Sequence, residues 1–147
     1  MKKIVLSFCF IMFIQIVLAQ TIQEPQIHVA KKVRKGQTLK YEFVNRTKRS
    51  VYVFDPMQIK IEKKKNGIWV QLETPYCPCG RACPPPPEIK EVMPNENIAF
   101  EWNLEESLCE NNEEKRRKVE KGLYRVILYY GTNPQDKQKL TKQFKIK

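Results

Sequence analysis

Short runs of alternating apolar and polar side chains fill the chain from Gln26 onward, and no stretch keeps the 3.6-residue period of an amphipathic helix. In residues 39–44, for example, Leu39, Tyr41 and Phe43 alternate with more polar neighbours. Turn-forming residues separate the runs roughly every ten residues. Because no segment offers a helix long enough for a βαβ crossover, the pattern predicts an all-β fold, an antiparallel sandwich of about seven to nine strands.

The clearest local signal is the pair Asn66-Gly67, which lies between the alternating runs 59–62 and 68–72. Both residues tolerate a positive φ angle, and a type I′ turn built from them matches the twist of the flanking strands. The sequence therefore predicts a two-residue β-hairpin at this point.

The remaining strands follow the same alternation. They are expected near residues 27–29, 39–44, 51–54, 89–92, 98–102, 123–130 and 140–146. The near-continuous run of β-formers in 123–130 predicts a central strand, and the lysines of 140–146 are typical of a protected edge. The polar stretch 105–121 predicts a surface helical turn or a mobile loop.

Five aromatic residues are expected to fill the space between the two sheets. They are Phe43, Trp69, Phe100, Trp102 and Tyr124. Tyr76, beside the cysteines, is the aromatic side chain that we expect to be exposed.

A resemblance supports the sandwich. The turn Pro94-Asn95-Glu96, an alternating strand through Trp102 and then Gly122-Leu123-Tyr124 resemble the closing half of immunoglobulin-like domains. In such domains a tyrosine at the place of Tyr124 hydrogen-bonds back to the chain. With Asn45 and the hairpin at 66–69, the order is similar to the bacterial intracellular proteinase inhibitor type of sandwich. The resemblance implies an immunoglobulin-like fold and raises protease inhibition as one activity.

The chain departs from that type by a cysteine- and proline-rich insertion. Three of the five cysteines and six of the ten prolines lie in residues 75–87, which can therefore be neither helix nor central strand. Its prolines 84–87 favour a polyproline II rod, which either stiffens the connection or offers a preformed surface to a partner. The side chains expected to contact a partner are Tyr76, Arg81, Pro84, Pro85 and Pro86.

Four cysteines follow the N-terminal segment, namely Cys77, Cys79, Cys83 and Cys109. In an exported chain an even count predicts a disulfide framework. We favour Cys79 with Cys83 and Cys77 with Cys109, because a Cys77–Cys79 bond would close a very small ring. Two alternatives stay open: the four thiolates bind zinc or copper, or the cysteines are redox-active.

The first 19 residues have the features of a secretory signal peptide. Lys2 and Lys3 give a positive start, an apolar run reaches Leu18, and Ala19 is a small residue before the expected cleavage site. The apolar run is shorter than the ~20 residues that a membrane span needs. We therefore expect residues 20–147 to be one domain, secreted or periplasmic, with no membrane span.

The formal net charge of +11 marks a basic protein, and loss of Lys2 and Lys3 leaves about +9. A charge of this size favours anionic partners. For an exported chain these are a surface or exported protein or an acidic glycan, and we do not expect nucleic acid.

No pattern typical of catalysis occurs: the chain lacks a Ser-His-Asp grouping, a phosphate-binding loop and a histidine-rich metal motif. The lone histidine, His28, is expected on a strand surface, and no cofactor is expected. The leading prediction is thus an exported, non-enzymatic module that presents a disulfide-braced loop to a protein or glycan, with protease inhibition and metal binding as alternatives. Asn45-Arg46-Thr47 is an N-glycosylation acceptor pattern in a host that glycosylates exported proteins.

Overall fold

The computed structural model describes residues 23–56, 58, 60–74, 77, 79–80, 82–83, 85 and 89–147. This part of the chain is all-β, with twelve strands and no helix. A helix able to cross a membrane is accordingly not found in it. The predicted signal peptide and its cleavage site lie outside the described residues.

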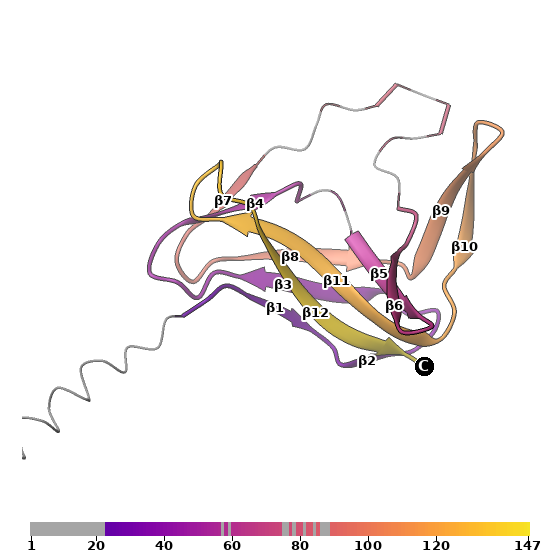
Figure 1. The fold of residues 1–147 in the computed structure, drawn as a ribbon, viewed down its shortest axis with the longest axis horizontal. Helices are drawn as coiled ribbons and strands as arrows, with labels where there is room; N and C mark the ends of the chain where they lie inside the picture. The colour runs from indigo at the N-terminus through magenta and orange to yellow at the C-terminus, as the bar shows by residue number, and fades with distance from the viewer. Residues whose placement is uncertain are drawn as a thin grey trace, which may run out of the picture.

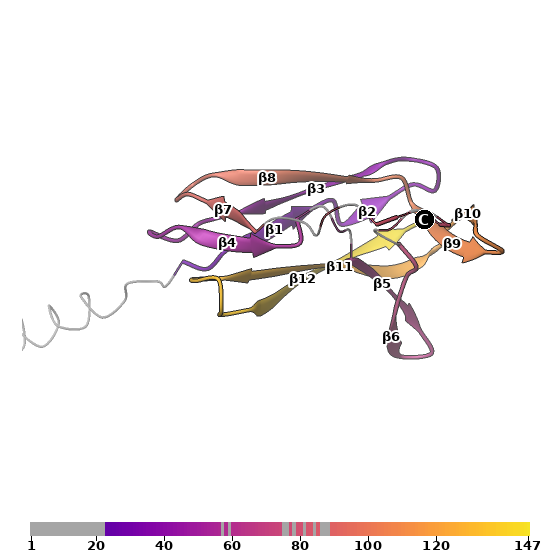
Figure 2. The ribbon, with the colours of Figure 1, turned by 90° about the horizontal axis from the view of Figure 1, so that it is seen from above.

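Two sheets form the body of the molecule as stacked layers (Figure 2). The smaller sheet is antiparallel and has the order β1 (Gln26–Val29), β3 (Leu39–Val44) and β8 (Asn97–Trp102). The larger sheet has seven strands around the long strand β11 (Gly122–Gly131). Its other members are β2 (Lys32–Val33), β4 (Val51–Phe54), β5 (Lys60–Lys65), β6 (Ile68–Gln71), β7 (Lys90–Val92) and β12 (Gln138–Ile146).

Strand β11 is central, as its β-forming run predicts. On one side it pairs with β12 from Gly122 to Tyr130. On the other side it pairs first with β5 and then with β4. Beyond these, β4 pairs with β7 and β5 pairs with β6, while β2 joins β12 in parallel at Lys145 and Ile146.

Aromatic rings from both sheets meet in the core. Trp102 of β8 lies 6.3 Å from the ring of Tyr124 on β11 and 6.4 Å from that of Phe144 on β12. Phe43 and Phe100 are buried with them, so the predicted core role is confirmed for four of the five aromatic residues. Burying this apolar area at about 25 cal/mol per Å² is the main force that holds the layers together.

Trp69 is the exception, and its predicted place in the core is wrong. It is half-buried on β6, where the guanidinium of Arg125 lies 4.4 Å from the ring centroid and Lys64 Nζ lies 5.8 Å from it. The β5–β6 hairpin projects away from the stacked layers, as Figure 2 shows. Because the smaller sheet does not cover this hairpin, Trp69 packs against cations instead.

Asn45 is completely buried at the end of β3. Its Nδ2 donates to the carbonyl oxygens of Arg49 (2.8 Å) and Val92 (2.9 Å), and its Oδ1 accepts from the backbone N–H and the hydroxyl of Thr47. The atom that would carry a glycan is therefore inside the folded domain and fully used in holding the 45–49 turn.

Nine of the twelve strands lie where alternation predicts them, including the hairpin at Asn66 and Gly67, whose φ angles are 49° and 83°. The three additional strands are β2, β9 (Glu105–Glu110) and β10 (Glu113–Lys118). They raise the number above the seven to nine expected. The prediction of a helical turn or mobile loop for 105–121 is wrong, because this polar stretch forms a hairpin.

Candidate functional site

The β9–β10 hairpin forms a two-stranded sheet of its own and extends from one end of the molecule (Figure 1). Its turn residues Asn111 and Asn112 have φ angles of 53° and 63°, which asparagine tolerates better than most residues. In the described part of the chain, Ser107 N–H donates to Glu73 O at 2.9 Å and the Trp102 indole N–H donates to Glu105 O at 2.9 Å, which ties β9 to the segment after β6 and to β8. The hairpin is thus an appendage of the two-layer body.

Charged side chains cover this hairpin, and every residue of β10 is exposed. Arg117 pairs with Glu106 across the strands at 2.9 Å, and Lys115 pairs with Glu110 at 2.6 Å. The hydrogen bond from Lys115 lowers the pKa of Glu110, and Glu106 raises the pKa of Arg117. Because both members of the Lys115–Glu110 pair are exposed and screened by water and salt, that pair stabilises the hairpin only weakly, whereas the Glu106 side chain of the other pair is 13% exposed.

The cysteine loop contains two disulfides. One bonds the loop to this hairpin, and the other closes a small ring within the loop. Cys79 bonds Cys109 on β9, with a Cα–Cα distance of 5.6 Å, and Cys77 bonds Cys83, at 4.7 Å. The prediction that these four cysteines form disulfides is confirmed, but the favoured pairing is wrong. The spacing of the cysteines in the sequence argues only against a Cys77–Cys79 bond. The choice between the two other pairings depends on the fold.

A turn at Cys79 and Gly80 lies against the hairpin at the point where the loop is bonded to it. Gly80 has a φ of 66°, and a Cβ at this position would lie 3.0 Å from the backbone oxygen of Asn112. This close approach sets the loop against the tip of the β9–β10 hairpin and brings Cys79 to Cys109. Cys77 and Cys83, on either side of the turn, are left to pair with each other.

The longer bridge contributes most of the covalent stabilisation. Cys79 and Cys109 are 30 residues apart, and closing a loop of that size stabilises a fold by about 3 to 4 kcal/mol in the chain-entropy treatment. The ring from Cys77 to Cys83 spans 6 residues and gives about 2 kcal/mol. We call the β9–β10 hairpin together with the loop bonded to it the braced end.

The predicted contact side chains are located only in part. Tyr76, Arg81, Pro84 and Pro86 lie outside the described residues, whereas Pro85 is exposed in the described part of the loop. With all four sulfurs in disulfides, no free thiolate remains among them to bind a metal, so the metal-binding alternative is not carried further.

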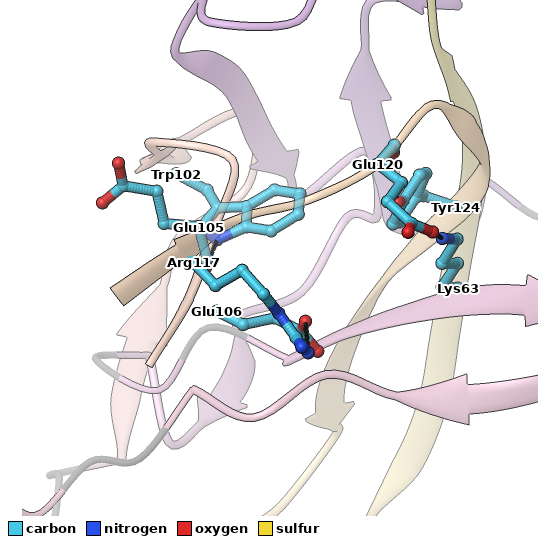
Figure 3. Close-up of polar contacts among 7 residues, drawn as sticks. All are labelled: Lys63, Trp102, Glu105, Glu106, Arg117, Glu120 and Tyr124. Carbon is cyan, nitrogen blue, oxygen red and sulfur yellow. Dashed lines mark hydrogen bonds and ion pairs between the residues drawn. The ribbon is translucent and has the colours of Figure 1, made fainter. Parts of the chain in front are cut away.

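A polar cleft of about 150 Å³ lies at the base of the braced end, between it and the β5–β6 hairpin. Figure 3 shows its central contacts: Arg117 pairs with Glu106, Lys63 pairs with Glu120, and Tyr124 donates its hydroxyl hydrogen to the Glu120 carbonyl at 2.5 Å. The lining residues come from separate segments. They are Lys63, Lys65, Leu72, Glu106, Arg117, Lys118, Val119, Glu120 and Tyr124.

We call this polar cleft the basic cleft, because four cationic side chains and two carboxylates line it. The Lys63 side chain is only 12% exposed, whereas that of its partner Glu120 is 82% exposed. The hydrogen bond from Lys63 lowers the pKa of Glu120, and burial raises the pKa of Tyr124 to about 12. The lining can therefore accept a small anionic group that competes with Glu120.

Sequence reasoning missed this cleft and the hairpin above it. The pairs Lys63–Glu120 and Arg117–Glu106 join residues that are 57 and 11 positions apart, and no local pattern links them. One signal in the sequence indicates the β9–β10 hairpin. Asn111-Asn112 is a turn pair, and the residues on either side of it can form pairs of opposite charge across two strands.

No protein-family model matches the chain, and no curated protein matches it in sequence. Among solved structures, a superoxide reductase (neelaredoxin) from Ignicoccus hospitalis aligns with 88% of this chain and 89% of its own, at 13% sequence identity and a TM-score of 0.37. At that similarity we take neither fold nor activity from it.

Proposed function

We propose that this chain is an exported, non-enzymatic binding module of the immunoglobulin-like class, and that its braced end contacts an acidic glycan or a surface protein. One observation carries the proposal. Cys79–Cys109 fixes a proline-rich loop to a hairpin that belongs to neither main sheet and exposes one whole strand. Such an exposed appendage contributes little to the core, and a covalent tie reduces the entropy that it loses when a partner binds.

Tyr124 supports the immunoglobulin-like assignment. Its hydroxyl donates to the carbonyl of Glu120, four residues upstream, at the start of the long strand β11. This is the bond that forms the tyrosine corner of immunoglobulin-like domains. The two stacked layers, antiparallel except where β2 joins β12, agree with the same class.

An acidic partner agrees with the charges. The whole chain carries +11, and the basic cleft beside the braced end has an excess of cationic side chains. The two disulfides agree with an oxidising compartment outside the cytoplasm. An acidic glycan or an acidic protein surface would be drawn to this end by long-range attraction.

The test measures binding to an array of sulfated and uronic acid glycans, with a cation-exchange resin as the reference for nonspecific attraction. Arg117→Gln with Lys118→Gln removes two charges from the basic cleft, and Lys139→Gln with Lys142→Gln removes two from β12 as the matched control. We expect the cleft variant to lose glycan binding by about tenfold and both variants to elute alike from the resin. Equal glycan binding by the two variants contradicts the proposal.

Protease inhibition, which the resemblance implies, would use the same braced end. Titration of the protein against a panel of secreted proteases separates the two functions. Inhibition that is lost in Cys79→Ser with Cys109→Ser would assign the braced loop to a protease cleft instead of a glycan.

A further inference from the structure

The β5–β6 hairpin presents a second surface, beside the braced end: just beyond β6, the outward carbonyl of Glu73 accepts from the N–H of Ser107 on β9 at 2.9 Å. In the described part of the chain β6 pairs with β5 alone, so its other edge meets no strand. Two aliphatic side chains on β6, Ile68 and Val70, are 69% and 41% exposed. They point to one face, because residues two apart in a strand lie on the same side.

This edge lacks the charges that usually protect an edge strand. Natural edges carry lysine or other charged residues against pairing with further chains, as β7 does with Lys90 and Glu91, and as β10 does at every position. The sequence of β6, by contrast, is Ile-Trp-Val-Gln. Its backbone edge is therefore open to another strand.

The register shows which backbone groups are available. The amide of Leu72 donates to the carbonyl of Ile61 at 2.9 Å, and hydrogen-bonded pairs alternate along antiparallel strands. Val70 and Ile68 are consequently bonded to β5, whereas the N–H and C=O groups of Trp69 and Gln71 point away from it. Two residues on β6 can thus exchange backbone hydrogen bonds with an added strand.

The charges nearby favour an acidic occupant. Lys64 and Lys65 on β5 lie directly opposite Trp69 and Ile68 and are exposed, whereas Lys63, opposite Val70, is already paired with Glu120. The side chains of an added strand would lie about two strand spacings, or ~10 Å, from β5. Long lysine side chains of β5 can reach that far, and the distance is close to one Debye length, so the attraction is only partly screened. A second copy of this chain would bring its own +11 charge to the same place and be repelled.

We propose that β6 is a docking edge for an extended, acidic polypeptide segment that adds as a further strand, with its aliphatic side chains beside Ile68 and Val70. This surface goes beyond the proposed function, because its docking groups are the backbone of Trp69 and Gln71 on β6 and not the disulfide-bonded loop, although β9 lies beside the same edge at Glu73. Backbone bonds supply affinity, and the aliphatic and charged contacts select the segment.

The probe is a synthetic peptide of roughly ten residues, long enough for one strand, in which valine alternates with glutamate. We expect the peptide to slow amide hydrogen exchange at Trp69 and Gln71 in the full chain and to leave Ile68 and Val70 unchanged. A peptide with lysine in place of glutamate should produce no protection. Absence of binding, or protection without this alternation, overturns the proposal.

Gln71→Pro and Gln71→Ala form a matched pair of variants. Proline removes the outward N–H but leaves the β5–β6 bonds intact, since edge strands accept proline where the N–H faces solvent. It should weaken peptide binding about tenfold, the value of one hydrogen bond, whereas alanine should bind like the parent. Equal binding by both variants contradicts strand addition.

Two further measurements identify other occupants. Binding of phosphatidylserine vesicles in preference to the peptide would assign the hairpin to a membrane surface and overturn the proposal. Concentration-dependent protection of Trp69 and Gln71 without peptide would assign the edge to a second copy and also overturn it. The variant with Cys79→Ser and Cys109→Ser should bind the peptide like the parent, whatever becomes of glycan binding.

Discussion

The two hairpins at one end of the molecule use the same turn chemistry and are held in opposite ways. Both turn on asparagine with positive φ, at Asn66 and at Asn111 and Asn112. The β5–β6 hairpin continues the larger sheet through its register with β11 and packs Trp69 against Arg125. The β9–β10 hairpin pairs with neither sheet and is tied to the rest of the chain by Cys79–Cys109 and by the hydrogen bonds of Ser107 and Glu105. An appendage that buries only part of one strand gains most from a covalent tie.

The largest effect should follow loss of that tie. Cys79→Ser with Cys109→Ser is expected to lower the free energy of unfolding by about 3 to 4 kcal/mol, because the unfolded chain regains the entropy of a long loop. Amide protection should disappear in β9 and β10 while β5 and β6 keep theirs. Denaturant unfolding and hydrogen exchange measure the two effects. If β9–β10 stays protected, the disulfide is not what holds it.

Trp69→Ala tests the noncovalent contact that holds the β5–β6 hairpin, the counterpart of the disulfide in the other hairpin. It removes a half-buried ring and its cation–π contact with Arg125, so we expect a loss of about 2 kcal/mol and faster exchange in β5 and β6. Ile68→Ala is the control, since the Ile68 side chain is largely exposed and should change stability by less than about 0.5 kcal/mol. Similar losses for both would show that Trp69 does not anchor the hairpin.

Gly67→Ala probes the turn itself. Gly67 has a φ of 83° and nothing within 4 Å of an added Cβ, so the cost comes only from the left-handed backbone. We expect about 1 kcal/mol of destabilisation, measured by thermal unfolding. Asn111→Gly, at a φ of 53°, should change stability by less than about 0.5 kcal/mol. A neutral Gly67→Ala would mean that the turn relaxes freely.

Acidification should produce the smallest loss of stability, and it should weaken the β9–β10 hairpin more than the β5–β6 hairpin. Hydrogen bonds from Lys115 and Arg116 lower the pKa of Glu110 and Glu114 below the ordinary 4.5. Their contribution is complete above pH 4.5 and is lost as the pH falls through the lowered folded values. NMR shifts should report more weakening of β9–β10, which holds two such carboxylates, than of β5–β6, where only Lys63 loses a carboxylate partner, Glu120. At about 1 M salt, where the Debye length is ~3 Å, the difference should vanish; its persistence would exclude these ion pairs as the cause.

Prediction from the sequence worked where one short segment carries the signal. Residues 59–72 predict their own hairpin, because Asn66-Gly67 and two alternating runs are contiguous. It failed where apolar alternation is absent, as in β10, whose six residues are all charged. The four cysteines were predicted to form disulfides, but their pairing depends on Gly80 lying against Asn112 from a distant part of the chain.

The amino-acid order by itself determined the all-β composition, the long central strand and the presence of disulfides, because alternation, turn residues and cysteine number act locally. Only the tertiary structure decided that Cys79 meets Cys109, that Lys63 meets Glu120 and that no described strand pairs with the outer edge of β6. Each of these depends on which segments become neighbours once the two layers bury their shared core, and a linear pattern does not contain that information.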